Sequence, residues 1–199
     1  AFYIDISKDR LYTFGAPSRA RRSAQTAVYT IADGLTRLLA PLLPVTADEL
    51  WRHLPGSRED SVHLADFPVG TQSLVDQPLL ERWQRLLALR EAVNVELERL
   101  RQQKSVGTSL EASVTIRASG AVATLLTEPP PDLPMLFITS EVDVAEDPTL
   151  STDAAAAHAQ YTETGGAAVI EVARSDGVKC ARCWRYVPSV SDDAEFEGL

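Results

Sequence analysis

Residues 76–103 read DQPLLERWQRLLALREAVNVELERLRQQ. Apolar residues return every three or four positions along this stretch, which places them on one face of an α-helix. They are Leu79, Leu80, Trp83, Leu86, Leu87, Leu89, Val93, Leu97 and Leu100. The pattern predicts the longest helix of the chain, one that is capable of bridging two domains.

A second amphipathic helix is expected ahead of it, from Arg19 to Leu39, again with apolar residues at three- and four-residue steps. Pro41 and Pro44 end this helix. The next residues, Thr46-Ala47-Asp48-Glu49, are expected to form a capping box that opens a short helix reaching Leu54. The tryptophans at 51 and 83 fall within apolar stripes, so both are predicted to be core anchors.

The pattern changes after Gly107, because apolar and polar residues alternate over 110–116, as in a strand. Further strands are expected at about 135–144, 157–163 and 167–173, with a small helix at about 120–127. The expected domains are a helical bundle over 1–104, a small α/β module over 105–175 and a partial zinc knuckle over 176–199. The fold class is therefore predicted to be mainly α.

Charge is unevenly placed along the 199 residues, whose formal net charge is −9. Residues 1–104 hold 14 Lys/Arg and 13 Asp/Glu, while residues 105–199 hold 5 and 15. Because phosphate contacts come from local basic clusters, the nearly neutral first part remains compatible with RNA binding. The sequence has no apolar run of about 18 residues for a membrane span. A cytoplasmic location is expected. Since the sequence starts at Ala1 inside a patterned segment, we expect a piece of a longer protein.

The two cysteines, Cys180 and Cys183, lie in the stretch GVKCARCW at 177–184. Two thiolates at this spacing can hold one zinc ion from a tight turn, but a structural zinc takes four ligands. Three interpretations stay open: half of a zinc knuckle, a redox pair, or two cysteines without a shared role. The redox interpretation is weakened because Trp184 and Pro188 follow the pair, where a thioredoxin-like motif would begin a helix.

Basic and aromatic side chains are grouped around these cysteines. Unstacked RNA bases stack on aromatic rings while lysine and arginine hold phosphates, so Trp184 with Lys179, Arg182 and Arg185 could form an anticodon platform. The alternative is that Trp184 packs over the turn, Tyr186 packs on a strand and the cations are only solvated. Residue types alone do not separate the two.

A second basic group lies near the N-terminus and is a candidate phosphate-binding patch. Its members are Lys8, Arg10, Arg19, Arg21 and Arg22. Each of them could equally be an ordinary solvated side chain. Arg82, Arg85 and Arg90 on the long helix are similar, although Glu81 and Glu91 dilute their charge. The three histidines are assigned no role, and no phosphate loop, nucleophile elbow or metalloprotease motif is present, so no catalytic residue is expected.

Several segments, in order and spacing, resemble the anticodon-binding domain of class I isoleucyl-tRNA synthetases. They are YIDISKDRLY at 3–12, RRSAQT at 21–26, LAPLLPVTADELW at 39–51, SVHLADFP at 61–68, LREAVN at 89–94 continuing to LEA at 110–112, and KCARCW at 179–184. The valyl and leucyl enzymes share the helical bundle, so they remain an alternative. The cysteine motif favours the isoleucyl family.

The resemblance implies a parent enzyme that uses ATP to activate isoleucine and attaches it to its tRNA, tRNA(Ile). The implied partners are tRNA(Ile) and the parent catalytic domain with its ATP and isoleucine, and neither DNA nor a membrane is expected. The adenylate-site motifs of the family, His-x-Gly-His and Lys-Met-Ser-Lys-Ser, are absent. Its second Cys-x-x-Cys pair is absent too, so the implied zinc site is incomplete. A rival hypothesis is a non-catalytic protein-interaction scaffold with incidental cysteines.

Overall fold

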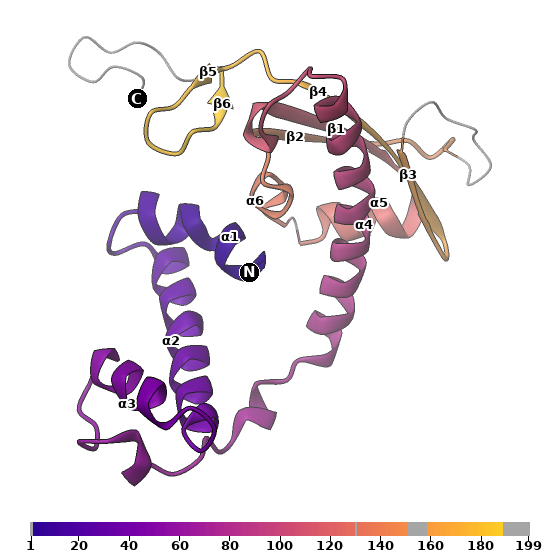
Figure 1. Cartoon of the computed structure of the whole chain (residues 1–199). Coiled ribbons are helices and arrows are strands. Elements are labelled where there is room, and N and C mark those ends of the chain that lie inside the picture. The colour runs from indigo at the N-terminus through magenta and orange to yellow at the C-terminus, as the bar shows by residue number, and fades with distance from the viewer. Residues whose placement is uncertain (1, 130, 151–158, 189–199) are drawn as a thin grey trace. The chain divides into compact units, whose positions relative to one another are not determined.

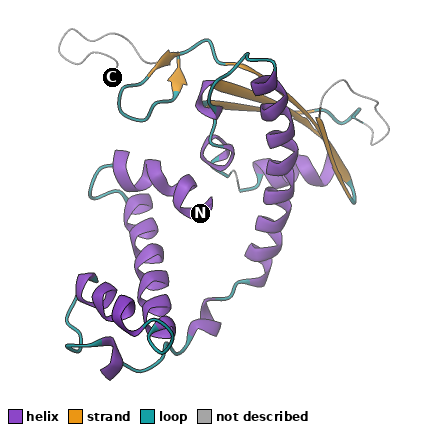
Figure 2. Ribbon diagram, viewed as in Figure 1, coloured by secondary structure: helices purple, strands orange, loops and turns teal. Residues whose placement is uncertain are grey.

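The computed structural model describes residues 2–129, 131–150 and 159–188. By their contacts the residues form two compact units, one of Ser7–Asp76 and one of Ala1–Ile6 with Gln77–Leu199. Figure 1 labels the elements of both, and the α1 helix (Phe2–Lys8) carries the chain from one to the other. All described strands belong to the unit that contains Gln77 (Figure 2). We call this the sheet unit and the other the helical unit.

The helical unit is built on helix α2 (Arg19–Leu39). Ser18 caps its start by accepting a hydrogen bond at Oγ from the backbone N–H of Arg21, at 3.4 Å. Its bounds agree with the prediction from the apolar spacing. One π-helical turn, η1 (Asp9–Thr13), precedes it, and two short 3-10 turns follow later, η2 (Val62–Leu64) and η3 (Thr71–Leu74).

Helix α3 (Pro44–His53) starts two residues before the predicted capping box. Leu43 is the residue at its N-cap, and no side chain caps the helix. Proline suits the first turn because its missing N–H would have no helical partner there. The carboxylate of Asp48 instead accepts a hydrogen bond from Ser61 Oγ at 2.6 Å. The capping-box prediction was therefore wrong.

Trp51 is the core of the helical unit, with 1% of its surface exposed. Its indole N–H donates to the Glu59 carbonyl at 2.8 Å. The guanidinium groups of Arg58 and Arg37 lie 4.4 and 5.1 Å from its ring centroid. Both arginines form ion pairs with Asp33. The prediction that Trp51 is a core anchor is confirmed.

The sheet unit holds a four-stranded sheet in the order β2-β1-β4-β3. Its strands are β1 (Ala112–Ala118), β2 (Glu141–Glu146), β3 (Ala159–Glu163) and β4 (Gly166–Arg174). Strand β1 pairs with β2 in parallel, and the remaining pairs are antiparallel. The sheet is therefore mixed, as short strands joined partly by hairpins and partly by crossover helices require.

Helix α4 (Gln77–Gln102) contributes one side of the sheet unit's core. Its buried apolar residues are Leu86, Leu89, Val93, Leu97 and Leu100, which share the core with alternate residues of β1. Trp83 packs against this core from a half-buried position. The helix was expected to belong to a bundle over 1–104, whereas its buried apolar residues between Leu86 and Leu100 pack against the sheet. Among the described residues, none of the helices has the length and apolar character needed to cross a membrane.

Two short helices complete the sheet unit. Helix α5 (Gly120–Thr127) lies where the sequence predicts it. Helix α6 (Leu133–Phe137) occupies a stretch that the sequence analysis assigned to the strand at 135–144, so the first part of that prediction was wrong. Asp132 caps α6 by accepting from the Met135 N–H at 3.2 Å, and Ile138 ends it with a φ of 59°. The strand itself begins only at Glu141.

Candidate nucleic-acid interface

The two cysteines lie in a small hairpin, which we call the cysteine hairpin (residues 178–187). Its strands β5 (Val178–Lys179) and β6 (Tyr186–Val187) are antiparallel, with Lys179 opposite Tyr186. Inside the turn, the Cys180 N–H donates to the Arg185 carbonyl at 2.8 Å, and the Trp184 N–H donates to the Cys180 carbonyl at 2.9 Å. Cys180 and Cys183 are not joined in a disulfide, and both are half-buried. The turn thus presents them together.

The pKa of the Cys180 thiol is lowered, mainly because the backbone N–H of Cys183 donates to its sulfur. Burial opposes this shift, while the N–H and the charge of Arg182 add to it. A lowered pKa favours the thiolate, which is the form that binds a metal. Among the described residues, no group of three or more His, Cys, Asp and Glu side chains could hold a metal ion. The two thiols could therefore fill at most two of the four positions of a tetrahedral zinc site.

Trp184 has a left-handed backbone conformation, with a φ of 64°. This region is unusual for a bulky residue and is found mostly where surrounding structure imposes it. Its side chain is 62% exposed, and the ammonium nitrogen of Lys179 lies 5.7 Å from its ring centroid. Tyr186 is half-buried on β6. The hairpin thus brings Trp184 and Lys179 together at the surface, with Arg182 exposed and Arg185 half-buried beside them.

The N-terminal basic residues fall on three consecutive segments. Lys8 ends α1, Arg10 lies in η1, and Arg19, Arg21 and Arg22 occupy the first turn and the start of the second turn of α2. Lys8, Arg19 and Arg22 are exposed. Arg21 donates to the Phe14 carbonyl at 2.9 Å and so fixes the chain that leads into α2.

The three arginines of α4 bind the protein itself. Arg82 donates to the Leu125 and Glu128 carbonyls, each at 3.1 Å, and to Pro129, so it caps the end of α5. Arg85 forms a two-point ion pair with Glu163. Arg90 donates to the Leu136 carbonyl at 3.1 Å. Each of these arginines thus fixes another element of the sheet unit, and their grouping with the candidate phosphate-binding residues stays a prediction.

The Arg85 pair also involves a tyrosine. Tyr161 donates from its hydroxyl to Glu163 at 3.0 Å. Donation from Arg85 holds the pKa of Glu163 below its usual value. Burial, followed by the bond to Glu163, raises the pKa of Tyr161 to about 12. These groups join α4 to β3.

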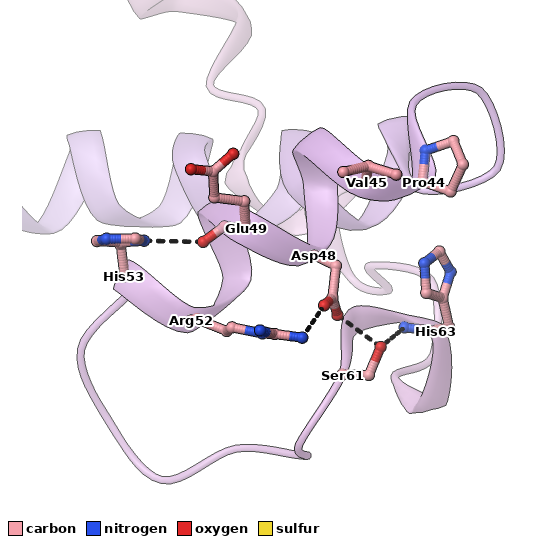
Figure 3. A pocket seen from close by; sticks show the side chains of 8 residues that line it. All are labelled: Pro44, Val45, Asp48, Glu49, Arg52, His53, Ser61 and His63. Carbon is pink, nitrogen blue, oxygen red and sulfur yellow. Dashed lines mark hydrogen bonds and ion pairs between the residues drawn. The ribbon is translucent and has the colours of Figure 1, made fainter.

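Figure 3 shows an open depression beside α3, of about 570 Å³. It is lined by Pro44, Val45, Asp48, Glu49, Arg52, His53, Ser61 and His63. Asp48 accepts from Ser61 and Arg52, and the Ser61 bond is the main cause of its lowered pKa. The His53 ring nitrogen lies 2.8 Å from the Glu49 carbonyl. Asp48 thus joins the helix to the loop that follows it, while the His53 contact stays within the helix.

Two serines that the sequence analysis did not single out touch the cysteine hairpin. Ser140 Oγ accepts from the Tyr186 N–H at 2.6 Å, and Ser175 Oγ donates to the Tyr186 carbonyl at 2.9 Å. Both serines are isolated in the sequence, 46 and 11 residues from their partner. No spacing or motif indicates them.

The sequence matches a known family and several curated relatives. A family model described as the anticodon-binding domain of tRNA ligase matches residues 1–116. Curated relatives named isoleucine–tRNA ligase include those of Syntrophotalea carbinolica (42% identical over 200 residues), Halorhodospira halophila (44% over 199) and Geobacter sulfurreducens (40% over 199). Each alignment covers 100% of this chain and 21% of the relative.

The chain therefore spans about a fifth of the length of these relatives. The match to the family model covers α1 through most of β1, including the whole helical unit. It includes the YIDISKDRLY segment at 3–12 and extends past the proline corner between α2 and α3. The resemblance to isoleucyl-tRNA synthetases is confirmed, and the chain belongs to the family of anticodon-binding domains of tRNA ligases.

Proposed function

We propose that this chain binds the anticodon stem and loop of tRNA(Ile), as part of a cytoplasmic isoleucine–tRNA ligase. The family match over residues 1–116 carries this proposal. The relatives named isoleucine–tRNA ligase support the choice of tRNA. In the parent enzyme, a catalytic domain with ATP and isoleucine makes the ester bond, while this part supplies recognition of the tRNA.

The cysteine hairpin is proposed to bind the anticodon loop. An unpaired base stacked on an exposed tryptophan contributes roughly 1–3 kcal/mol. Trp184 is exposed enough to offer such a face, and Lys179, Arg182 and Arg185 lie on the same hairpin to hold phosphates. The exposed ring is the geometric observation that favours this role over packing.

The N-terminal basic residues are proposed to hold phosphates of the stem. The N-terminus of a helix carries a partial positive charge, so cations in the first turn destabilise it. The first turn of α2 contains no acidic residue, and Arg19, Arg21 and Arg22 lie at this end of the helix. A bound phosphate would relieve the repulsion, since it is attracted both by the helix end and by the arginines. Lys8 and Arg10 extend the same patch.

Zinc is proposed to bind at Cys180 and Cys183, which would provide two of its four ligands. When bound, the metal would supply structural stability to the turn and no reactive group. The backbone hydrogen bonds at Cys180 close the short turn that carries both thiols. The lowered pKa of Cys180 supports a metal-binding role.

Equilibrium binding tests the proposal directly. The chain is titrated, at one fixed moderate salt concentration, with tRNA(Ile) and with the same tRNA carrying another anticodon loop. We expect a preference for the native loop that Trp184→Ala removes. Phe67→Ala is the matched control, because Phe67 is a similarly exposed aromatic residue of the helical unit outside both proposed surfaces.

Three other outcomes are informative. Equal weak binding to both RNAs would mean that the chain holds only phosphates. A preference that survives Trp184→Ala would place loop recognition away from the hairpin. No binding of either RNA would favour the protein-interaction scaffold.

A further inference from the structure

We propose that Ser140 and Ser175 are positioning residues for tRNA recognition, because together they fix the cysteine hairpin to the end of the sheet. Each serine holds one backbone group of Tyr186, and Tyr186 lies two residues after Trp184. This inference rests on the proposed function of the hairpin. Ser140 and Ser175 would contact no RNA themselves, but they would determine the positions of Trp184 and Lys179.

Ser140 lies immediately before β2 and is 4% exposed. Its backbone N–H donates to the Ala112 carbonyl at 3.0 Å. Its hydroxyl donates to the Leu110 carbonyl and accepts from the Tyr186 N–H at 2.6 Å. The serine is therefore fixed by its own backbone and uses its side chain as a bridge.

Ser175 has the same role from the other neighbour of β1. It lies immediately after β4 and is 7% exposed, and its N–H donates to the Glu111 carbonyl at 2.8 Å. Its hydroxyl donates to the Tyr186 carbonyl at 2.9 Å and accepts from the Gly177 N–H at 3.4 Å. Since Glu111 and Ala112 are consecutive, both serines are anchored at the same point, the start of β1.

The hairpin needs this support. Its two strands have two residues each, and such a short hairpin is at best marginally stable alone in water. Buried hydroxyls that satisfy both the N–H and the carbonyl of one residue fix its position in two directions. Gly177 fits the same contact, because a Cβ at this residue would collide with the backbone nitrogen of Val187. The base of the hairpin is therefore packed backbone against backbone, and the two serine hydroxyls join it to the sheet.

Tyr186 transmits the constraint to the RNA-binding side chains. It is paired with Lys179 across the hairpin. The preceding residue, Arg185, accepts the turn bond from Cys180, and Cys180 in turn accepts from the Trp184 N–H. Release of Tyr186 should thus free the whole turn while the sheet stays folded.

Hydrogen exchange in the whole chain tests the contact. In Ser140→Ala we expect the Tyr186 amide to exchange roughly fivefold faster or more, because it loses a buried acceptor whose bond contributes about 1 kcal/mol. The Ile170 amide in β4 should be unchanged. Ser119→Ala is the matched control: its hydroxyl donates to the Leu150 carbonyl at 3.2 Å and accepts from Ala167 at 3.4 Å, and Ser119 follows the opposite end of β1. Ser175→Ala is a second variant in case Ser140→Ala fails to fold.

A double-mutant cycle tests the consequence for binding. Preference for the native anticodon loop should fall at least fivefold in Ser140→Ala, and adding Trp184→Ala should then weaken it little further. A serine that mattered only for folding would give additive losses. Unchanged exchange at Tyr186, or additive losses, would overturn the positioning role. If the unaltered chain showed no loop preference at all, the proposed function would fail, while the exchange rates would still decide whether the serines hold Tyr186.

Discussion

Lys179 and Trp184 lie against each other across the cysteine turn, with the ammonium nitrogen 5.7 Å from the centroid of the indole ring. A cation–π contact at an exposed site contributes about 0.5–1 kcal/mol, which is less than the roughly 1–3 kcal/mol of a stacked base. Under the proposed function, an arriving base would therefore replace the ammonium group on the ring. The displaced lysine would then remain beside the base, where its ammonium group could form an ion pair with a phosphate.

The first prediction concerns this lysine. Lys179→Gln should weaken tRNA binding and reduce the slope of log K against log salt by about 0.7, the value for one single-stranded phosphate contact. Binding is measured at several sodium chloride concentrations. Lys104→Gln is the control, since Lys104 is also exposed but lies in the turn two residues after α4, outside the hairpin. Equal slopes for the two variants would show that Lys179 contacts no phosphate.

A second prediction concerns the backbone at Trp184. A left-handed conformation costs an ordinary residue roughly 1–2 kcal/mol, and glycine avoids most of this cost. Trp184→Gly and Trp184→Ala both lose the ring, but the glycine variant should keep the turn closed more of the time. We expect the Cys180 amide, which donates to Arg185, to exchange about fivefold more slowly in Trp184→Gly than in Trp184→Ala. Slower exchange in Trp184→Ala than in Trp184→Gly would mean that the backbone conformation of residue 184 does not limit opening of the turn.

The third prediction concerns the core of the helical unit. Trp51→Ala should lower the free energy of unfolding of this unit by about 3–5 kcal/mol, because it leaves a large cavity and removes the indole bond to Glu59. Urea unfolding followed by circular dichroism measures the change. Tyr12→Ala in the same unit should shift stability by no more than about 0.5 kcal/mol, since its side chain is 76% exposed. A small effect at Trp51 would contradict its anchoring role.

Local sequence patterns were sufficient for the elements whose apolar face is the dominant signal. Helix α2 has the predicted bounds, and α4 differs by one residue at each end. The stretch at 133–137 failed because a short apolar run fits a buried helix as well as a strand. Asp132 and Pro134 were the available clue, since an N-cap residue followed by an early proline is typical of a helix start.

The candidate site was less predictable, because its geometry depends on distant partners. The arginines of α4 resemble a basic patch in the sequence, but their acceptors lie 36 to 78 residues away. The left-handed conformation of Trp184 has no signal in its residue type, since glycine or asparagine would be expected there. The two serines that bond to Tyr186 have no distinguishing sequence context, and they come together only because β2 and β4 both pair with β1.

The fourth prediction concerns Cys180. Its lowered pKa should give half-maximal alkylation by iodoacetamide at a pH below the usual value of 9.0, in a Cys183→Ser variant that leaves one thiol. The same variant unfolded in urea should return to the ordinary value, because the backbone donors are lost. Addition of zinc should slow alkylation of the unaltered chain more than that of the variant. Equal protection would show that the two thiols do not share a metal.

The fifth prediction is a pH dependence set by Glu163. Because donation from Arg85 depresses the folded-state pKa of this carboxyl below 4.5, its charge stabilises the folded state above about pH 4.5. That contribution is lost as the pH falls through the folded-state pKa, where the carboxylate takes up a proton. Glu163→Gln should lower the free energy of unfolding by about 1 kcal/mol at pH 7, a modest value because Arg85 is 41% exposed.

The gap between the unaltered chain and Glu163→Gln should therefore shrink steadily as the pH is lowered from 6 to 3, which urea unfolding at each pH can follow. Glu171→Gln is the matched control on the neighbouring strand, since its partner Arg117 and Glu171 itself are 46% and 45% exposed. Solvent screens that pair, so its removal should change little at any pH. A gap that stayed constant with pH would mean that Glu163 acts through its shape and hydrogen bonds, and that its charge does not stabilise the junction of α4 and β3.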